Sequence, residues 1–247
     1  IVPAFIAHTF NQVTPLTLVL PLFFGLTYAW LTTPRSIGPF LALLLFFVFL
    51  DPLAILFVIS IGVYLALATV DRLKRLEVEY ELGLFSIFFA LWALFLIYKK
   101  LIVFHGPNVI WQNIPQNMFS SFYSNLTIIG MVVQIGAYPL AEGIYALYKT
   151  AFKSPQKEID MLLSITVVSS VLLWLKLLDV STGLIFLGVT LAILFSKWTA
   201  LSIKFLKTTK LSRYARHILA VSILLAFIST AVPAYGAIRM QLENTIT

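Results

Sequence analysis

The sequence predicts an all-α protein, a polytopic transmembrane helix bundle of about seven to eight membrane segments with a tight hairpin around Asp51-Pro52. Three observations predict this fold class. Hydrophobic residues make up 60% of the 247 residues, charged residues make up only 11%, and the mean hydropathy is +0.98. A soluble domain carries roughly 25% charged residues, and a soluble fold could not bury so much apolar surface. We therefore expect an integral membrane protein.

The membrane segments follow from runs of about 20 mostly apolar residues, the length that crosses a bilayer. We expect segments at residues 14–31, 37–50, 53–70, 82–104, 126–148, 161–178, 183–201 and 218–238. The second and third meet at Asp51-Pro52, where proline removes a backbone donor and the preceding residue avoids the helical region. Two helices joined by a tight turn formed by Asp51 are the expected geometry. A single kinked helix is the alternative.

The basic residues predict the orientation, because connections rich in Lys and Arg stay in the cytoplasm. Of the 17 basic residues, 13 lie in alternate connections: one after the first segment, three after the third, three after the fifth and six at 197–217. We therefore expect 197–217 in the cytoplasm and 105–125 outside, in the plasma membrane of a prokaryote. The net charge of +7 then reflects membrane topology, so we expect membrane lipids as partners and no nucleic acid.

An uncharged external loop, "HGPNVIWQNIPQNMFSSFYSN" at 105–125, contains most of the candidate binding residues. Its aromatic rings suit the headgroup zone, which favours a segment lying flat on the membrane. The alternative is a sugar-binding loop, because neutral amides and aromatic faces match sugar hydroxyls and rings. The candidate substrate-binding residues of this loop are His105, Trp111, Gln112, Asn113 and Gln116.

Glu142, in "YPLAEGIY", is the clearest ionisable residue at membrane depth. Such residues are costly in the membrane and are functional candidates for that reason. We expect either a buried carboxylate that pairs with a basic group or a polar ligand, or a carboxylate hydrated near the interface. Pro139, three residues earlier, is expected to bend the helix.

Outside the membrane segments, the sequence predicts surface and capping roles. The stretch "DRLKRLEVEYELG" at 71–83 has basic and then acidic residues, which predicts an amphipathic surface helix. Asp179 precedes a helix expected to start near Gly183, so we expect it to cap that helix. The sequence has no Cys, no zinc-type His spacing, no phosphate-binding glycine loop and no nucleophile elbow.

Both ends of the chain predict a fragment of a longer protein. The chain starts at Ile1 rather than Met, and it stops in the polar stretch "RMQLENTIT". We expect residues 1–247 to form a single transmembrane domain, with an external soluble domain after Thr247.

Three stretches carry a resemblance to a known family. "PRSIGPFLALLLFFVFLDPLAILFVISIGVYLALATVDRLKR" combines a broken hydrophobic hairpin with a basic stretch, "FHGPNVIWQNIP" is an external loop, and "AVPAYGAIRMQLENTIT" is a last span with a polar tail. This layout resembles the later transmembrane half of GT-C-type polytopic glycosyltransferases, which depend on lipid-phosphate sugars. Protein mannosyltransferases and the oligosaccharyltransferase catalytic subunit belong to that family.

The resemblance implies a membrane-embedded glycosyltransferase module that transfers sugar from an isoprenoid-phosphate-linked donor on the external face. The external loop would then touch the sugar or the acceptor. The family's acidic residue of the first external loop and its WWD-type motif are both missing from this sequence, so no catalytic residue is carried over. The resemblance leaves a divalent metal open as a cofactor, with no ligands identified here.

Two other classes of function stay open. One is a secondary transporter or permease with Glu142 as its coupling carboxylate, although the internal repeats typical of transporters are not evident. The other is a non-catalytic scaffold subunit that holds an extracytoplasmic soluble domain or partner subunits in place.

Overall fold

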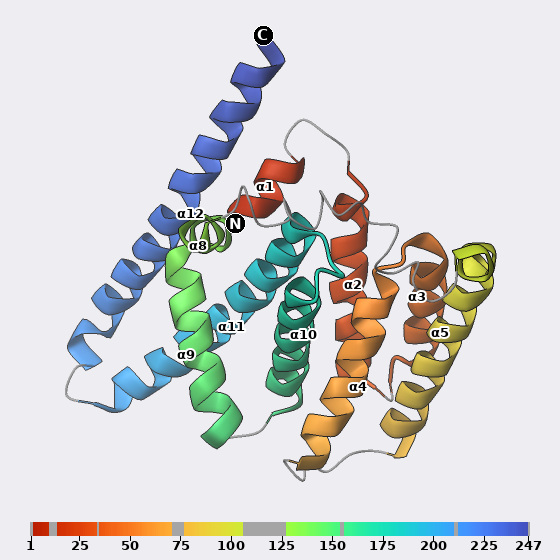
Figure 1. Cartoon of the computed structure of the whole chain (residues 1–247). Helices are drawn as coiled ribbons and strands as arrows, with labels where there is room; N and C mark the ends of the chain where they lie inside the picture. The colour runs from red at the N-terminus through yellow and green to blue at the C-terminus, as the bar shows by residue number, and fades with distance from the viewer. Residues whose placement is uncertain are drawn as a thin grey trace. The chain divides into compact units, whose positions relative to one another are not determined.

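The computed structural model describes residues 2–9, 14–33, 35–70, 77–105, 127–153, 156–209 and 212–246. All secondary structure in these ranges is helical (Figure 1), which confirms the all-α class. The chain divides into two compact units. The first unit comprises Ile1–Thr14, Asn125–Lys153 and Asp179–Thr247, and the second comprises Pro15–Ser124 and Ser154–Leu178.

In the part of the chain that the structure describes, three helices are long and apolar enough to cross a membrane. They are Glu77–Lys100 within α5 (Glu77–His105), Val180–Thr208, which is α11, and Arg216–Gly236 within α12 (Ala215–Ile246). Shorter apolar helices are α2 (Leu16–Leu31), α3 (Ile37–Leu50) and α4 (Ala54–Val70). This finding supports an integral membrane protein, and the number of membrane segments stays a prediction.

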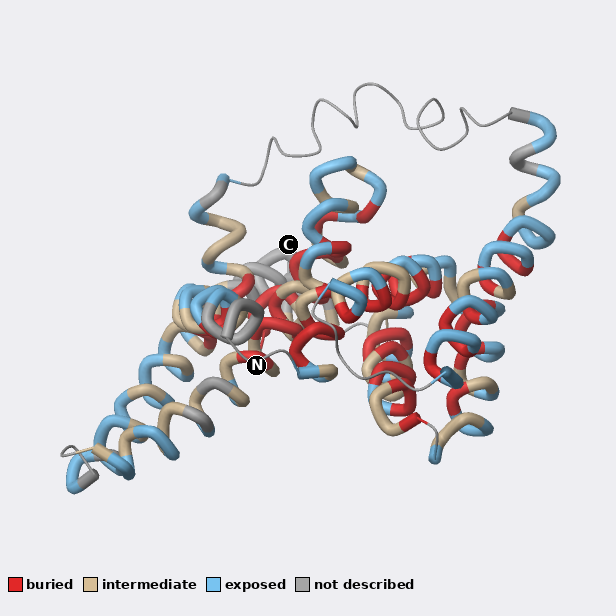
Figure 2. Tube along the Cα trace, turned by 90° about the horizontal axis from the view of Figure 1, so that it is seen from below, coloured by how far each residue is buried: buried red, intermediate tan, exposed pale blue. Residues whose placement is uncertain are grey.

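The second unit contains α2, α3, α4, α5 and α10 (Lys157–Trp174). α4 packs against both α10 and α5, while α2 packs against α3 and α10. Figure 2 shows that buried and exposed stretches alternate along the helices, as expected when each helix buries one side against its neighbours.

Aromatic side chains fill the space between α2, α3 and α4. The Phe23 ring lies 5.5 Å from the Phe57 ring, and the Trp30 ring lies 5.5 Å from that of Phe40 and 6.1 Å from that of Tyr64. All five of these side chains are at most 2% exposed. The edge-to-face pairs Phe23–Phe57 and Trp30–Tyr64 each add about 0.5–1.5 kcal/mol beyond their buried area, so we identify this cluster as the core of the second unit.

The predicted hairpin around Asp51-Pro52 is confirmed as two separate helices. α3 ends at Leu50 and α4 begins at Ala54. The Leu53 amide donates a hydrogen bond of 2.8 Å to Asp51 Oδ1, and the Asp51 backbone is extended. The alternative of one kinked helix is therefore wrong, and Asp51 has the turn role that its position before proline predicts.

The first unit contains α1 (Pro3–Thr9), α8 (Ile128–Ile135), α9 (Ala137–Lys153), α11, the short 3-10 helix η1 (Ser212–Tyr214) and α12. α9 packs against α11, and α1 packs against both α11 and α12. Asp179 caps α11 as predicted, because its carboxylate accepts hydrogen bonds from the Ser181 and Thr182 amides at 3.1 and 3.3 Å. α1 was not predicted from the sequence.

The segment predicted at 126–148 is two helices rather than one. α8 ends at Ile135, Gly136 has a φ of 100° that L side chains rarely adopt, and α9 begins at Ala137. The interruption therefore lies three residues before Pro139, where a bend was expected. Pro139 lies in the first turn of α9, where a missing amide donor costs little.

Close packing also depends on two glycines of this unit. A Cβ at Gly136 would lie 2.8 Å from Thr230 Cγ2 of α12. A Cβ at Gly143 would lie 2.9 Å from Leu191 Cδ2 and 3.1 Å from the Leu191 carbonyl oxygen of α11. α8, α9, α11 and α12 can approach one another this closely because these positions have no side chain.

Gly136→Ala should destabilise the protein, because alanine would adopt a strained backbone conformation and collide with the Thr230 methyl group. Strain of this kind costs about 1–3 kcal/mol, and we expect a lower midpoint of thermal unfolding in detergent. Gly236→Ala in α12 is the matched control, since no heavy atom lies within 4 Å of its added Cβ. Equal stability of the two variants would contradict a structural role for Gly136.

Candidate binding cavity

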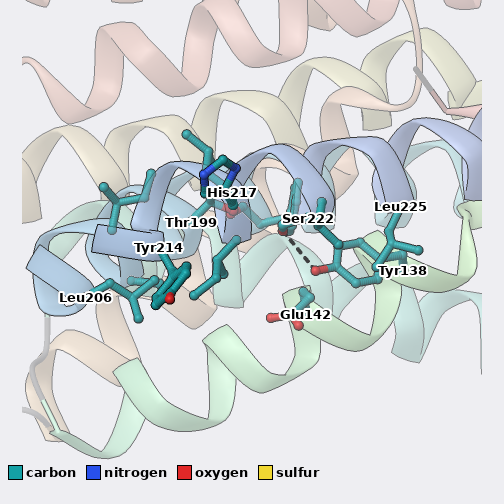
Figure 3. Close-up of a pocket in the computed structure, with 14 residues that line it drawn as sticks. Tyr138, Glu142, Thr199, Leu206, Tyr214, His217, Ser222 and Leu225 are labelled. Carbon is teal, nitrogen blue, oxygen red and sulfur yellow. Dashed lines mark hydrogen bonds between the residues drawn. The ribbon is translucent and has the colours of Figure 1, made fainter. Parts of the chain in front are cut away.

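A cavity of about 500 Å³ lies between α9, η1, α11 and α12 of the first unit (Figure 3). Its volume is in the range of about 300–1,000 Å³ that is typical of small-molecule sites. α11 and α12 supply most of the wall. The lining residues are Tyr138 and Glu142 of α9; Phe195, Thr199, Ser202, Ile203 and Leu206 of α11; and Tyr214, His217, Ile218, Leu219, Val221, Ser222 and Leu225 of η1 and α12.

The lining residues follow helical periodicity, so one face of each helix forms the wall. On α11 they extend from Phe195 to Leu206, eleven residue-to-residue steps that rise about 16 Å. On α12 they recur at three- and four-residue spacing from His217 to Leu225. The cavity is therefore elongated along these helices and lies beside the C-terminal half of α11.

The cavity has a polar region at its α9 side. Tyr138 Oη and Ser222 Oγ are 2.8 Å apart and share a hydrogen bond (Figure 3). The Tyr138 ring also lies 5.6 Å from the Phe195 ring in an edge arrangement. Tyr138 and Glu142 are four residues apart on α9, so both project from one face of that helix.

Glu142 is partly exposed and lines the cavity. Within the described part of the chain, its carboxylate has no hydrogen-bond or ion-pair partner. The predicted pairing with a basic side chain is therefore not found there. The carboxylate oxygens remain able to accept hydrogen bonds from a ligand in the cavity, and a ligand hydroxyl or amine would match them.

Only two of the predicted binding residues lie within the described part of the chain. Glu142 lines the cavity, and His105 is the last residue of α5, with its side chain outside the described residues. Trp111, Gln112, Asn113 and Gln116 lie wholly outside the described residues.

Sequence reasoning missed several polar cavity residues, among them Tyr138, His217 and Ser222. Tyr138 had a usable signal, because it lies one helical turn before Glu142 on the same face. His217 and Ser222 had none, since only the packing of α12 against α9 brings them to the cavity.

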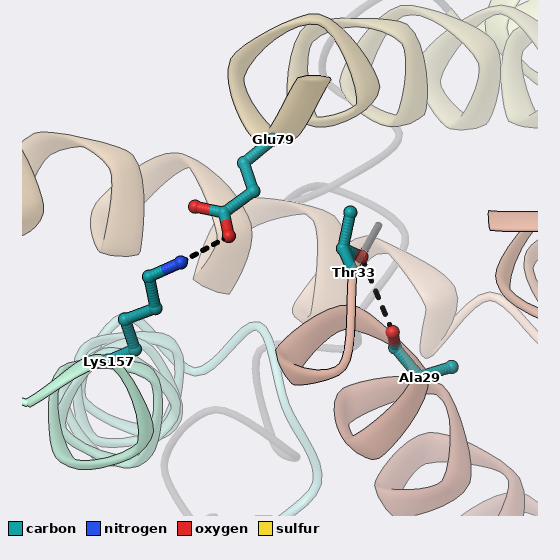
Figure 4. A network of polar contacts seen from close by, with 4 residues as sticks. All are labelled: Ala29, Thr33, Glu79 and Lys157. Carbon is teal, nitrogen blue, oxygen red and sulfur yellow. Dashed lines mark hydrogen bonds and ion pairs between the residues drawn. The ribbon is translucent and has the colours of Figure 1, made fainter. Parts of the chain in front are cut away.

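A second polar cluster lies in the second unit. Glu79 near the start of α5 forms an ion pair with Lys157, the first residue of α10 (Figure 4). Glu79 is only 2% exposed and its Oε2 atom has no hydrogen-bond partner. Residues 71–76 of the expected surface helix over 71–83 lie outside the described residues. In the remainder the expectation is wrong at Glu79, which faces the interior, whereas Glu77 and Glu81 are exposed.

Asp160 of α10 is a second buried carboxylate, and it lies on the same face of α10 as Lys157. It is 1% exposed and lies three residues after Lys157. Among the residues that the structure describes, no group of three or more His, Asp or Glu side chains could hold a metal ion. Lys157 and Glu79 form an ion-paired contact between α10 and α5.

Comparison of the chain with protein-family models, with curated proteins and with solved structures finds no match. The resemblance to GT-C-type glycosyltransferases accordingly stays a prediction from the sequence.

Lys157→Met should destabilise the second unit, because it leaves the buried Glu79 carboxylate without its cation. Breaking a buried pair on one side costs about 3–5 kcal/mol, and the 34% exposure of the Lys157 side chain places the expected loss at the lower end. Adding Glu79→Leu should restore most of the thermal stability in detergent, since a fully apolar contact removes the unpaired charge.

The exposed neighbour provides the control for this measurement. Glu77→Gln should shift stability by no more than about 0.5 kcal/mol, as is usual for surface changes. If the double variant were no more stable than Lys157→Met alone, an isolated Glu79 charge would not be the cause of the loss.

Proposed function

We propose that the chain crosses the plasma membrane of a prokaryote seven to eight times, with its lysine-rich connections in the cytoplasm. Contacts around Gly83 support this topology for the second unit. A Cβ at Gly83 would lie 2.7 Å from Leu65 Cδ1 and 3.2 Å from the Trp30 ring. The ends of α2 and α4 and the start of α5 are therefore together, as expected if the basic connections that follow α2 and α4 share one face.

In the first unit, the C-terminal ends of α9 and α11 both lie in the lower part of the view in Figure 1, where the turn between α11 and α12 also lies. Lys149 and Lys153 occupy the last turns of α9, and Lys204 and Lys207 occupy the last turns of α11. This arrangement supports one cytoplasmic end for the unit, in which α8 and α9 together form one bent segment.

The absence of native Cys allows a direct test of this orientation with single-cysteine variants. Thr208→Cys at the end of α11 and Leu177→Cys in the connection before α11 are both at exposed positions. In intact cells, a membrane-impermeant maleimide should label Leu177→Cys, and it should label Thr208→Cys only after permeabilisation. The reverse pattern would invert the topology.

We further propose that the protein is the membrane module of a glycosyltransferase, which binds an isoprenoid-phosphate-linked sugar. The cavity of the first unit is the observation that carries this proposal. It combines apolar walls from α11 and α12, suited to hydrocarbon, with Glu142, Tyr138 and Ser222, suited to sugar hydroxyls. An amphipathic ligand that resides in the membrane matches both parts.

The cavity and the loop at 105–125 have different roles in this proposal. In the proposed orientation the cavity lies in the cytoplasmic half of α11, whereas the loop lies outside. A donor held at Glu142 must therefore move before its sugar is transferred on the external face, where Trp111 and Asn113 would contact the sugar or the acceptor.

A permease is the second candidate, and the helix break favours it. Transporter sites often lie beside interrupted membrane helices, and Gly136 interrupts the α8–α9 segment six residues before Glu142. In that case Glu142 would couple proton movement to the passage of a polar solute through the cavity.

Glu142→Gln should weaken binding of a fluorescent isoprenoid-phosphate sugar to the purified protein in lipid nanodiscs by about tenfold, because a hydrogen bond to a charged acceptor is lost. Tyr138→Phe should have a smaller effect in the same direction. Glu81→Gln on the exposed side of α5 is the matched control and should bind as the wild type does.

Other outcomes would identify the alternatives. Loss of pH-coupled uptake by Glu142→Gln in proteoliposomes, with no donor binding, would favour the permease. No donor binding and no uptake by the wild type would favour a scaffold. Wild-type glycan transfer in a strain with Trp111→Ala plus Asn113→Ala would argue against a role for the external loop.

A further inference from the structure

Among the described residues, four exposed cations flank the turn between α11 and α12. Lys204 and Lys207 lie on the last turns of α11, Arg213 lies in η1, and Arg216 lies at the start of α12. We call these four residues the basic collar. None of them forms an ion pair within the described part of the chain, and residues 180–242 contain no Asp or Glu. Their charge is therefore not neutralised by their own helices.

The collar points away from the cavity. The cavity-lining positions of α11 are 195, 199, 202, 203 and 206, and the collar positions 204 and 207 are not among them. On η1 and α12, positions 214, 217, 218, 219, 221, 222 and 225 line the cavity, whereas 213 and 216 do not. The four collar residues are exposed and are not among the residues that line the cavity, so the collar cations face the surroundings rather than a ligand in the cavity.

The length of α11 places the collar at headgroup level. α11 has 29 residues, which rise about 43 Å, whereas the hydrocarbon core of a bilayer is about 30 Å thick. The apolar part of α11 can therefore cross the core while its last turns, with Lys204 and Lys207, extend into the interface.

Exposed apolar side chains beside the collar favour a lipid surface, rather than a soluble polyanion, as the binding partner of the collar. Phe205 is 69% exposed, Tyr214 is 56% exposed and Ile218 is 41% exposed. Aromatic rings among cations suit the headgroup zone, where an apolar body and a charge are both accommodated. A soluble acidic partner would leave the apolar side chains without contacts.

We propose that the basic collar binds the phosphates of anionic phospholipids in the adjoining leaflet and so holds the cavity mouth at the headgroup level. Leu206, Tyr214 and His217 line the cavity and lie within or beside the collar. Lipid binding at the collar therefore positions the side of the cavity that these residues form. This inference goes beyond the proposed function and does not depend on which ligand enters the cavity.

The test uses the full chain with Thr208→Cys, labelled with a small fluorophore and reconstituted into vesicles. We expect half-maximal quenching of the fluorophore by brominated phosphatidylglycerol at a mole fraction at least about fivefold lower than by brominated phosphatidylcholine. A preference of about fivefold is what one cation near anionic lipid provides. Changing the four collar residues to Gln should abolish this preference. High salt should reduce it in the unchanged collar, because exposed charges are screened.

Lys99→Gln plus Lys100→Gln on the exposed end of α5 is the control for net charge. It should keep the preference for phosphatidylglycerol. If the fourfold variant does not fold, Lys204→Gln plus Lys207→Gln and Arg213→Gln plus Arg216→Gln should each lower the preference. Equal quenching by both lipids, or a preference that survives removal of the collar cations, would overturn the proposal.

Discussion

The contact of α9 with α11 at Gly143 determines the geometry of the first unit. Because Gly143 has no side chain, the α9 backbone lies close to both the Leu191 side chain and its carbonyl oxygen. Glu142 directly precedes Gly143, and Tyr138 lies one turn before Glu142. The close approach at Gly143 therefore places both side chains beside the face of α11 that lines the cavity. In lipid, the burial of apolar surface contributes little free energy to helix association. Close van der Waals contact of this kind is therefore the main attraction between helices. The cavity is therefore a product of helix packing.

Glu79 of the second unit and Glu142 of the first unit differ in burial and in ion pairing. Glu79 is almost completely buried and has Lys157 as its counter-ion, so its charge contributes to the contact between α5 and α10. Glu142 is partly exposed to a cavity and has no partner in the described part of the chain. A paired buried charge is typical of structure, whereas an unpaired charge beside a cavity is typical of a binding site. This contrast favours Glu142 as the functional carboxylate.

Local signals in the sequence were sufficient for the fold class and for two caps. Asp51 before proline and Asp179 before a helix make hydrogen bonds within three residues of themselves, so their roles follow from the sequence. The burial of Glu79 and the Tyr138–Ser222 hydrogen bond depend on residues more than seventy positions away, which no local pattern can reveal. The helix break also escaped the prediction, because proline is a stronger local signal than a glycine with positive φ.

The length of α11 has a consequence for the membrane in which the protein works. Its 29 residues exceed the thickness of an average hydrocarbon core, so the helix must tilt or extend into the interface. A bilayer of longer acyl chains would cover more of the C-terminal half of α11, and a thinner one would leave more of it in water. Since that half lines the cavity, we expect the hydration of the cavity to depend on acyl-chain length.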